Sequence, residues 1–430
     1  MKKMFKKVLS LVICFAVLSV GILGTALNAS AVKYNTNADW MAGKYGISMH
    51  YLHENAGGQG STIATFNEAV NSFDVDKFAK TAKEVGASWV LLTMSQSTGV
   101  TCAPNAYMEE LSGLKLGTDR DLVLDMYDAL EPYGIKLMLY FHGGVPKGNP
   151  ALARAMGAVE RVGQTSADIG QSTGDYLYKY SVAEHQAAMY KEFSDRYGDK
   201  ISGWWIDGCY DNCDFNERIA KLYVNAMKSG NPNTIVALNG GTRTQDCRFD
   251  VEDYHCGERW SPTVEGQNTF YNDNPTSRWT KTGFQQQYWI YLGSNWGQPG
   301  TSHKTDEVVK HAYEVVSSGA ALTFDICSTS IDKTGTIDAE QLAQLKAIND
   351  YIKAKPAYKM EETPTITETE DDTSSETETT DTSVDKTEVK VETKKISQNK
   401  WIYLGIGIEA VLIIGAVVLI ILKKKKVNTK

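Results

Sequence analysis

Short apolar runs alternate with amphipathic stretches over most of this chain, from about residue 40 to about residue 355. The runs predict strands at residues 45–50, 89–93, 136–141, 202–207, 235–239, 249–254, 287–292 and 321–326. Apolar residues within the runs do not alternate strictly with polar ones, which is typical of parallel strands that are buried on both faces. The pattern therefore predicts repeated β-α units that build a parallel sheet.

The amphipathic stretches predict helices at residues 74–85, 120–133, 182–197, 215–228, 305–317 and 339–353. Asp74 and Thr305 are of the residue types that cap helix N-termini, and Gly86 and Gly134 follow expected helix ends. Eight strands in one segment, residues 32–358, predict a single (β/α)8 barrel of the TIM type. A doubly wound open sheet is the alternative, and it is disfavoured because no phosphate-binding glycine loop follows the first run.

Both ends of the chain carry apolar runs that we interpret as targeting segments. Residues 1–31 begin with lysines, continue through an apolar run and end in Ala-Ser-Ala, as a secretory signal peptide does. Residues 401–422 form a second apolar run that is long enough for a single transmembrane helix. Lysines dominate residues 423–430, which predicts a cytoplasmic tail and a barrel anchored outside, at the cell surface.

The segment between the barrel and the second apolar run, residues 359–400, is rich in Thr, Glu, Asp, Ser and Lys. Such a segment buries too little apolar surface to offset the entropy of ordering, so it predicts a disordered stalk. Much of the formal net charge of −8 belongs to this stalk. The chain has no basic stripe and no recognition motif, so we expect no nucleic-acid partner. The pattern does not indicate an oligomeric state.

The chain has 7 cysteines, of which Cys14 lies in the predicted signal peptide. The others are Cys102, Cys209, Cys213, Cys247, Cys256 and Cys327. An exported protein can pair an even number of cysteines, although their spacing does not fix a pairing. The spacings match no zinc motif, and we expect neither a metal nor a cofactor.

Active sites of TIM-type barrels lie at the C-terminal ends of the strands. The polar residues expected at these ends are His50, Ser95, His142, Asp207, Asn239, Glu258 and Asp325. Among them Asp207 closes the apolar run of residues 201–206 and is followed by a glycine, so we expect its carboxylate at the mouth of the barrel, beside Trp205. The alternative is an aspartate that only caps the next loop or helix.

Hydrolysis of a glycosidic bond normally takes two carboxyl groups, which lie about 5 Å apart in retaining enzymes. Glu258 is the second candidate because it lies in a loop beyond the sixth predicted strand, and Glu252 is the alternative. Glu258 is equally compatible with a solvated loop glutamate that pairs with Arg259.

Three segments in order resemble the α-L-fucosidases of glycoside hydrolase family 29. Residues 44–50, Lys-Tyr-Gly-Ile-Ser-Met-His, are similar to the first strand of that family, which ends in a sugar-binding histidine. Residues 204–208, Trp-Trp-Ile-Asp-Gly, are similar to the segment that holds its nucleophile, and residues 253–258 resemble the segment that often holds its acid/base. The similarity extends from about Trp40 to about Lys353.

The resemblance implies a retaining exo-glycosidase with a carbohydrate substrate. Asp207 would be the nucleophile and Glu258 the acid/base, whereas His50 would hold a sugar hydroxyl. The further residues expected to bind the sugar are Trp205, Tyr140, His142, Trp296 and Arg248, with Arg243 as an alternative arginine.

The chain departs from this family in two places. The family usually carries Lys-His-His-Asp-Gly-Phe after its second strand, where residues 95–100 read Ser-Gln-Ser-Thr-Gly-Val. Family members also commonly carry a β-sandwich after the barrel, where the predicted stalk begins here. A hydrolase for a different sugar and a non-catalytic glycan-binding barrel therefore remain alternatives to an α-L-fucosidase.

Overall fold

The computed structural model describes residues 32–56, 62–160, 176–177, 179–211, 214–242, 246–258, 277–328 and 334–360. The predicted signal peptide, transmembrane segment, cytoplasmic tail and all but the first two residues of the predicted stalk lie outside these ranges and stay predictions. Among the described helices, none combines the length and the apolar character that a bilayer crossing requires.

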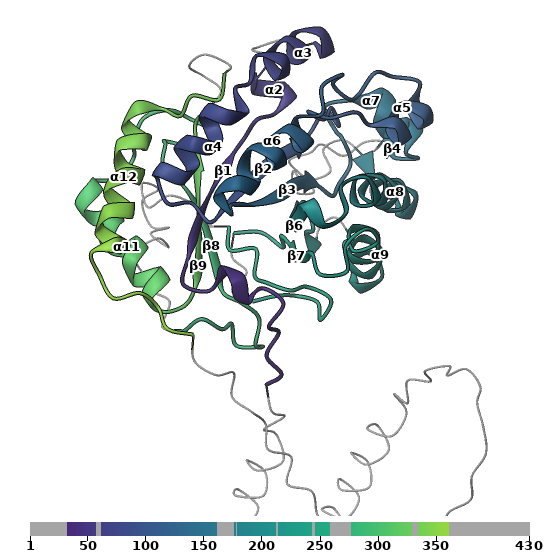
Figure 1. Cartoon of the computed structure of the whole chain (residues 1–430). Helices are drawn as coiled ribbons and strands as arrows, with labels where there is room; N and C mark the ends of the chain where they lie inside the picture. The colour runs from purple at the N-terminus through teal and green to yellow at the C-terminus, as the bar shows by residue number, and fades with distance from the viewer. Residues whose placement is uncertain are drawn as a thin grey trace, which may run out of the picture. The chain divides into compact units, whose positions relative to one another are not determined.

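A curved parallel sheet forms the centre of the described barrel region (Figure 1). Its strands are β1 (Tyr45–Met49), β2 (Trp89–Ser95), β3 (Lys136–His142), β6 (Ile201–Asp207), β7 (Ile235–Leu238), β8 (Gln287–Tyr291) and β9 (Ala321–Ile326). They pair in the order β7-β6-β3-β2-β1-β9-β8, and every pair is parallel. Seven of the eight predicted strands are thereby confirmed. A separate antiparallel pair joins β4 (Val159–Glu160) to β5 (Tyr176–Leu177).

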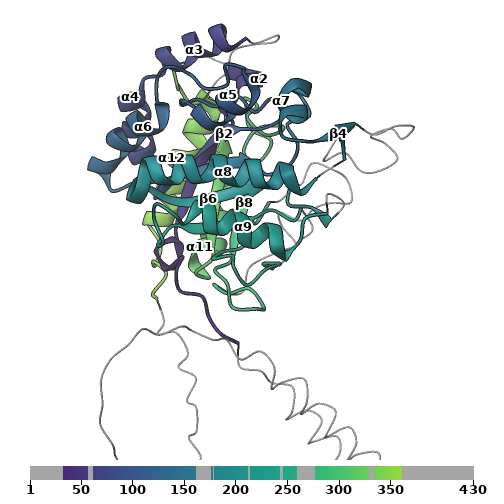
Figure 2. The same cartoon turned by 90° about the vertical axis from the view of Figure 1, so that its right-hand side faces the viewer.

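All six predicted helices are present and surround the outer face of the sheet (Figure 1). They are α4 (Val75–Glu84), α6 (Leu122–Leu130), α8 (Tyr180–Tyr197), α9 (Glu217–Met227), α11 (Thr305–Ser317) and α12 (Ala339–Lys353). After a turn of 90°, α8 and α9 lie in front of β6 (Figure 2). Further short helices are η1 (Asp39–Met41), α2 (His53–Ala56), α3 (Ile63–Ser72), α5 (Ala106–Ser112), η2 (Glu131–Tyr133), α7 (Pro150–Ala155) and η3 (Gly198–Lys200).

The two predicted helix caps have different outcomes. Asp74 caps α4, because its Oδ1 accepts a hydrogen bond from Lys77 N at 3.0 Å. The prediction for Thr305 is wrong: this residue is the first residue of α11, and Lys304 precedes it without a side-chain cap. Thr305 instead accepts a long hydrogen bond of 3.4 Å from Gln344 on α12.

The predicted sixth strand is wrong, because residues 249–253 form turns and bends. Two carboxylates take the place of strand pairing along β7. Glu252 Oε2 accepts from Leu238 N at 2.9 Å, and Asp253 Oδ2 accepts from Val236 N at 2.9 Å. Only one backbone bond resembles a ladder, from Asp253 N to Val236 O at 2.8 Å. Side-chain oxygens thus accept hydrogen bonds from backbone N–H groups at the edge of β7, where a regular strand would otherwise pair.

The same segment then reaches β8 on its other side. Tyr254 and Glu258 form isolated parallel bridges with Gln285 and Trp289, respectively. Residues 252–258, which we call the closing segment, therefore connect the two outermost strands of the sheet without forming a regular strand. This arrangement is consistent with a TIM-type barrel.

Alternation along the strands divides the buried side chains into two layers. On β6, Trp204 and Ile206 pack outward against the helices, whereas Trp205 points into the barrel with Tyr140 and Trp289. Each buried Trp removes on the order of 200 Å² from water, which corresponds to roughly 5 kcal/mol. The buried aromatic side chains therefore form a stable layer beneath the residues at the strand ends.

Candidate active site

Asp207 is the last residue of β6, and its carboxylate accepts four hydrogen bonds. Oδ1 accepts from Gly208 N at 2.8 Å, from the Tyr210 hydroxyl at 2.7 Å and from Asn239 Nδ2 at 2.9 Å. Among the residues that the structure describes, Oδ2 accepts from the Tyr140 hydroxyl alone, at 2.9 Å. Three donors thus hold one oxygen in place, while the other oxygen keeps the greater freedom to react.

Glu258 lies beside Asp207 and shares a donor with it. Asn239 Nδ2 donates to Asp207 Oδ1 at 2.9 Å and to Glu258 Oε2 at 2.6 Å. Because both oxygens lie on one nitrogen, these two distances limit their separation to at most about 5.5 Å. That limit agrees with the separation of about 5–5.5 Å typical of retaining glycosidases, and it is shorter than the separation typical of inverting ones.

The closing segment explains how a loop glutamate reaches this position. Its bridge to Trp289 of β8 places Glu258 over the barrel interior, although the residue has no regular strand to hold it. Among the two carboxyl groups that the sequence offered for the acid/base, Glu258 is therefore the one that meets Asp207.

Glu252, the alternative acid/base, has a structural role. It is 1% exposed, and its oxygens accept from the backbone N–H groups of Leu238, Arg248 and Phe249 at 2.8–3.0 Å. Burial raises the pKa of Glu252 to about 7, even though these donors favour the charged form. Both of its oxygens are thus committed to backbone groups of the chain.

His50 follows β1 and is held by Asp325 at the end of β9. The His50 Nδ1 to Asp325 Oδ1 distance is 2.8 Å, and the ring lies flat against Trp289, with centroids 5.7 Å apart at an angle of 6°. Trp296 covers another side of the imidazole at 5.6 Å. The bond at Nδ1 leaves Nε2 as the ring nitrogen available for a substrate.

Neighbouring carboxylates control the charge of this histidine. Burial alone would lower the pKa of His50, but Asp325 raises it, and Asp207 and Glu258 raise it further, so the net shift is upward. His50 is thus close enough to both candidate catalytic carboxylates to interact with them electrostatically. A raised pKa favours the protonated imidazole, which is a hydrogen-bond donor.

Asp325 is itself fully engaged. Besides His50, it accepts from the Ser48 hydroxyl at 2.9 Å and from Gly297 N at 2.6 Å. The second bond fixes the turn that carries Trp296, so one carboxylate orients both the histidine and its aromatic neighbour.

Tyr140 and Trp205 form the layer beneath the carboxylates. The Tyr140 hydroxyl donates to Asp207 and accepts from Gln96 Nε2 at 3.0 Å. Trp205, which we expected to face a sugar, is 1% exposed; it stacks on Tyr140 at 5.3 Å and donates to Cys256 O at 2.8 Å. Trp205 lies two residues before Asp207 on the same face of β6, and therefore one layer deeper in the barrel.

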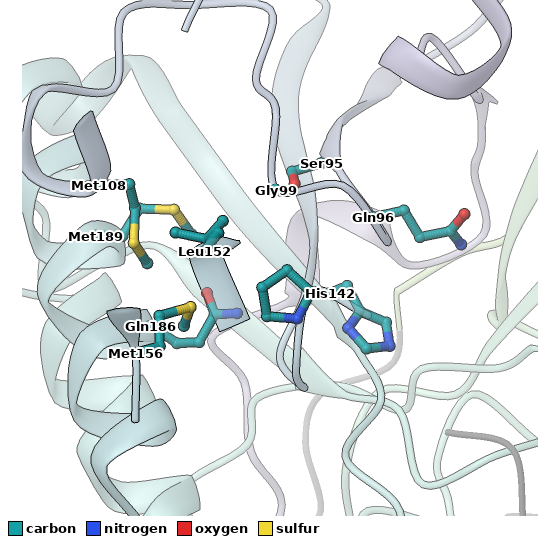
Figure 3. Close-up of a pocket in the computed structure, with 10 residues that line it drawn as sticks. Ser95, Gln96, Gly99, Met108, His142, Leu152, Met156, Gln186 and Met189 are labelled. Atoms are coloured by element: carbon teal, nitrogen blue, oxygen red, sulfur yellow. The ribbon is translucent and has the colours of Figure 1, made fainter. Parts of the chain in front are cut away.

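His142, at the end of β3, lies on the border between the carboxylates and a side pocket (Figure 3). Burial lowers the pKa of His142, and the Asp207 carboxylate offsets only part of this shift. Its Nδ1 accepts from Gly144 N at 3.1 Å, as expected for a neutral imidazole. Met108, Met156 and Met189 lie across this pocket from His142.

Arg248 does not contact the two carboxylates. It binds the Asp211 carboxylate and the carbonyl oxygen of Cys209, and thereby ties the loop after β6 to the residues that precede the closing segment. The expectation that Arg248 binds a sugar is therefore not supported by its contacts, and the alternative, Arg243, lies outside the described residues.

The loop that replaces the family's histidines is held by a glutamate from α2. Glu54 Oε1 accepts from the Ser97 hydroxyl at 2.9 Å and from Thr98 N at 3.0 Å. Its other oxygen, Oε2, is buried without a hydrogen-bond partner. Glu54 also acts electrostatically on His142, which places it at the same end of the barrel.

Two further features concern other expectations from the sequence. Within the described ranges, no cluster of His, Cys, Asp or Glu residues has a geometry suited to a metal. Cys102, Cys209, Cys247, Cys256 and Cys327 are thiols, whereas Cys213 lies outside the described residues.

Sequence reasoning assigned no role to Asn239, Tyr210 or Asp325. Asn239 and Asp325 had one usable signal, their position at a strand end. Tyr210 had none, because it lies in a loop and reaches back to Asp207 only through the local turn.

Comparison with known structures gives the same fold. An endo-fucoidan hydrolase of glycoside hydrolase family 107 is similar, with a TM-score of 0.58 at 16% identity over 74% of this chain and 54% of that chain. An α-L-fucosidase of family 29 from Bacteroides thetaiotaomicron, trapped as a covalent intermediate, gives 0.51 at 16% identity over 75% of each chain. At such identities the similarity concerns the fold alone.

The chain spans about half the length of the first of these enzymes. A search of curated proteins finds no match. The family model for α-L-fucosidases, in contrast, matches residues 15–356, which is most of the sequence. The chain therefore belongs to the α-L-fucosidase family.

Proposed function

We propose that this protein is a retaining exo-glycosidase that removes α-linked fucosyl residues from glycans. The observation that carries this proposal is the single amide nitrogen of Asn239 between Asp207 and Glu258, which limits two of their oxygens to about 5.5 Å. Two carboxyl groups at that separation suit a covalent mechanism, and family membership supports fucose as the sugar.

In the first step Asp207 attacks the anomeric carbon and displaces the aglycone. Oδ2 is the better nucleophilic oxygen because it accepts only one hydrogen bond. Glu258 gives its proton to the departing glycosidic oxygen while the bond to the carbon breaks. The product of this step is a covalent glycosyl ester on Asp207, together with the released aglycone.

In the second step Glu258, now ionised, takes a proton from water, and the resulting oxygen attacks the same carbon. The ester bond to Asp207 breaks, and the sugar leaves with its original anomeric configuration. His50 supports both steps because its Nε2 donates to a sugar hydroxyl while Asp325 holds its Nδ1.

A comparison of Asp207→Asn with the wild type on an aryl α-L-fucoside tests the nucleophile. We expect kcat to fall at least about 1,000-fold, since the neutral amide cannot form the ester. Asp250→Asn is the matched control, because Asp250 is exposed and follows Arg248 and Phe249 in the same part of the chain. Full activity of Asp207→Asn would refute the mechanism.

Glu258→Gln tests the acid/base independently. We expect kcat/KM to fall strongly on substrates with poor leaving groups and little on a dinitrophenyl fucoside, which needs little protonation. On the dinitrophenyl fucoside kcat should still fall, because water is no longer activated to hydrolyse the covalent intermediate. Azide should restore turnover of the activated substrate, because it replaces the water that Glu258 would activate. An equal loss on both substrates, without rescue by azide, would contradict the assignment.

The sugar itself is tested with aryl α-L-fucoside, galactoside, xyloside and arabinoside. The panel is needed because residues 95–100 lack the histidines that the family commonly carries there. Preference for the fucoside supports the proposal. Preference for another sugar keeps the mechanism and changes the substrate.

We further propose that the enzyme works outside the cell while tethered to the membrane. The signal-peptide pattern of residues 1–31 and the apolar run at residues 401–422 support this location. Protease treatment of intact cells should release the barrel and its activity. Activity that stays inside protease-treated cells would contradict the proposal.

A further inference from the structure

Asn239 occupies an unusually constrained position between the two candidate catalytic carboxylates. Its side chain is fully buried, and it directly follows β7. Its backbone N–H donates to Ile206 O at 2.7 Å, and its carbonyl accepts from Cys209 N at 3.1 Å. The backbone of Asn239 is thus fixed to both sides of the strand end that carries Asp207.

The orientation of the amide is fixed as well. Asn239 Oδ1 accepts from the backbone N–H of Gly241 at 2.9 Å and from the Cys256 thiol at 3.3 Å. Because the backbone N–H can only donate, the atom that it meets must be the oxygen. The nitrogen therefore points at the carboxylates, and its two hydrogens serve one carboxylate each.

We propose that Asn239 is a positioning residue that sets the separation of Asp207 and Glu258 and the proton balance between them. This inference rests on the proposed function. Two carboxyl groups this close repel each other when both are ionised, and a shared donor favours the charged form of each. Loss of the donor would make both groups harder to ionise and would remove the hydrogen bond from Asn239 to Glu258.

The pH dependence of kcat/KM separates this role from simple structural support. In Asn239→Ala, both limbs of the pH profile should move upward by about half to one pH unit, as expected for one lost hydrogen bond at each carboxylate. We expect kcat to fall about 10- to 100-fold and KM to change less than about threefold, because Asn239 has no hydrogen left for the substrate.

Asn239→Asp is the second variant, and it keeps the shape of the side chain if Asn239→Ala does not fold. A carboxylate at this position donates only when protonated, so activity should be confined to acid pH, with a loss of more than about 100-fold near pH 7. Asn231→Ala is the matched control. Asn231 precedes β7 at the opposite end and bonds Ile201 O at 3.2 Å, so its loss should leave the pH limbs unchanged.

The outcomes distinguish this inference from the proposed function. Wild-type activity that Asp207→Asn abolishes, together with an unchanged pH profile and kcat in folded Asn239→Ala, would overturn the role of Asn239 alone. A wild-type protein without turnover of any aryl glycoside would overturn both. Shifted pH limbs in both Asn239 variants, with unshifted limbs in Asn231→Ala, would establish the role.

Discussion

The chemistry of this site depends on residues whose hydrogen bonds orient the side chains and loops around the two carboxylates. Asp325 acts through its neighbours, because it binds His50 and the turn that carries Trp296. Glu54 similarly holds the loop of Ser97 and Thr98 that replaces the histidines of the family. The supporting carboxylates therefore decide which donors and acceptors a sugar meets.

Replacement of Asp325 by Asn should weaken sugar binding. The substitution removes the carboxylate that raises the pKa of His50, so the imidazole becomes neutral at a lower pH and donates less well. We expect kcat/KM to fall about 10- to 100-fold, mainly through KM, with a loss that is smallest at acid pH. Steady-state kinetics from pH 4 to 8 check this, with Asp250→Asn as the control; an unaltered KM would contradict it.

Replacement of Glu54 by Gln tests the unpartnered oxygen. Glu54 Oε2 is buried and accepts no hydrogen bond, so a donor on the bound sugar is its natural partner. The amide of Gln cannot accept at that position if its oxygen keeps the bonds to Ser97 and Thr98. We expect KM to rise about 10-fold while kcat changes little, as initial-rate kinetics would reveal. An unchanged KM would show that no sugar group reaches Glu54.

At the scale of elements, the closing segment is the part that sequence patterns could not predict. Residues 249–254 have the length and flanking turns of a strand, but Glu252 and Asp253 use their side chains where a strand would use its backbone. Whether a carboxylate faces a neighbouring strand edge or solvent depends on the spacing of β7 and β8, which no local pattern encodes. The regular strands and the six large helices were predictable because their burial repeats along the chain.

The same reason explains the mixed outcome at the site. Asp207 and His50 were predictable from strand ends, whereas the loop position of Glu258 was equally compatible with a solvated glutamate and only the resemblance favoured a catalytic role. The depth of Trp205 was not predictable, because alternation gives the face of a strand but not the height of a residue below the rim. The partners of Arg248 were not predictable, because Cys209 and Asp211 lie in a different loop.

Glu252→Ala should destabilise the fold because three backbone N–H groups, one of them buried and two partly buried, lose their acceptor. We expect the free energy of unfolding to drop by about 2–4 kcal/mol. Urea denaturation at pH 7 measures this, with Glu314→Ala as the control because Glu314 is exposed on α11. Equal stability of the two variants would contradict the role of Glu252 in closing the barrel.

At the scale of the whole molecule, the barrel contains two buried histidines to which the proposed mechanism assigns no role. His303 and His311 are 7% and 4% exposed, and burial lowers the pKa of each to about 4. Glu307 opposes the shift of His303, whereas His303 adds to the shift of His311. Both are therefore neutral in the folded protein at a pH where the unfolded chain already binds protons.

The fold should consequently lose stability as the pH falls from about 6.5 to about 4. Above pH 6.5 both histidines are neutral in the folded and in the unfolded protein. Between pH 6.5 and pH 4 only the unfolded chain binds the protons, which lowers the free energy of unfolding by up to about 3 kcal/mol per histidine. The double variant His303→Gln/His311→Gln should flatten this dependence, and His185→Gln, whose histidine is partly exposed, should not. Denaturation curves at several pH values decide; an equally steep dependence in the double variant would contradict the assignment.

The most direct test of the account is the identity of the residue that carries the sugar. Glu258→Gln, incubated with 2-deoxy-2-fluoro-α-L-fucosyl fluoride, should accumulate one fluorofucosyl group per protein, and peptide mass spectrometry should place the label on Asp207. A label on another residue, or no label on a folded protein that still hydrolyses fucosides, would contradict the pairing of Asp207 with Glu258.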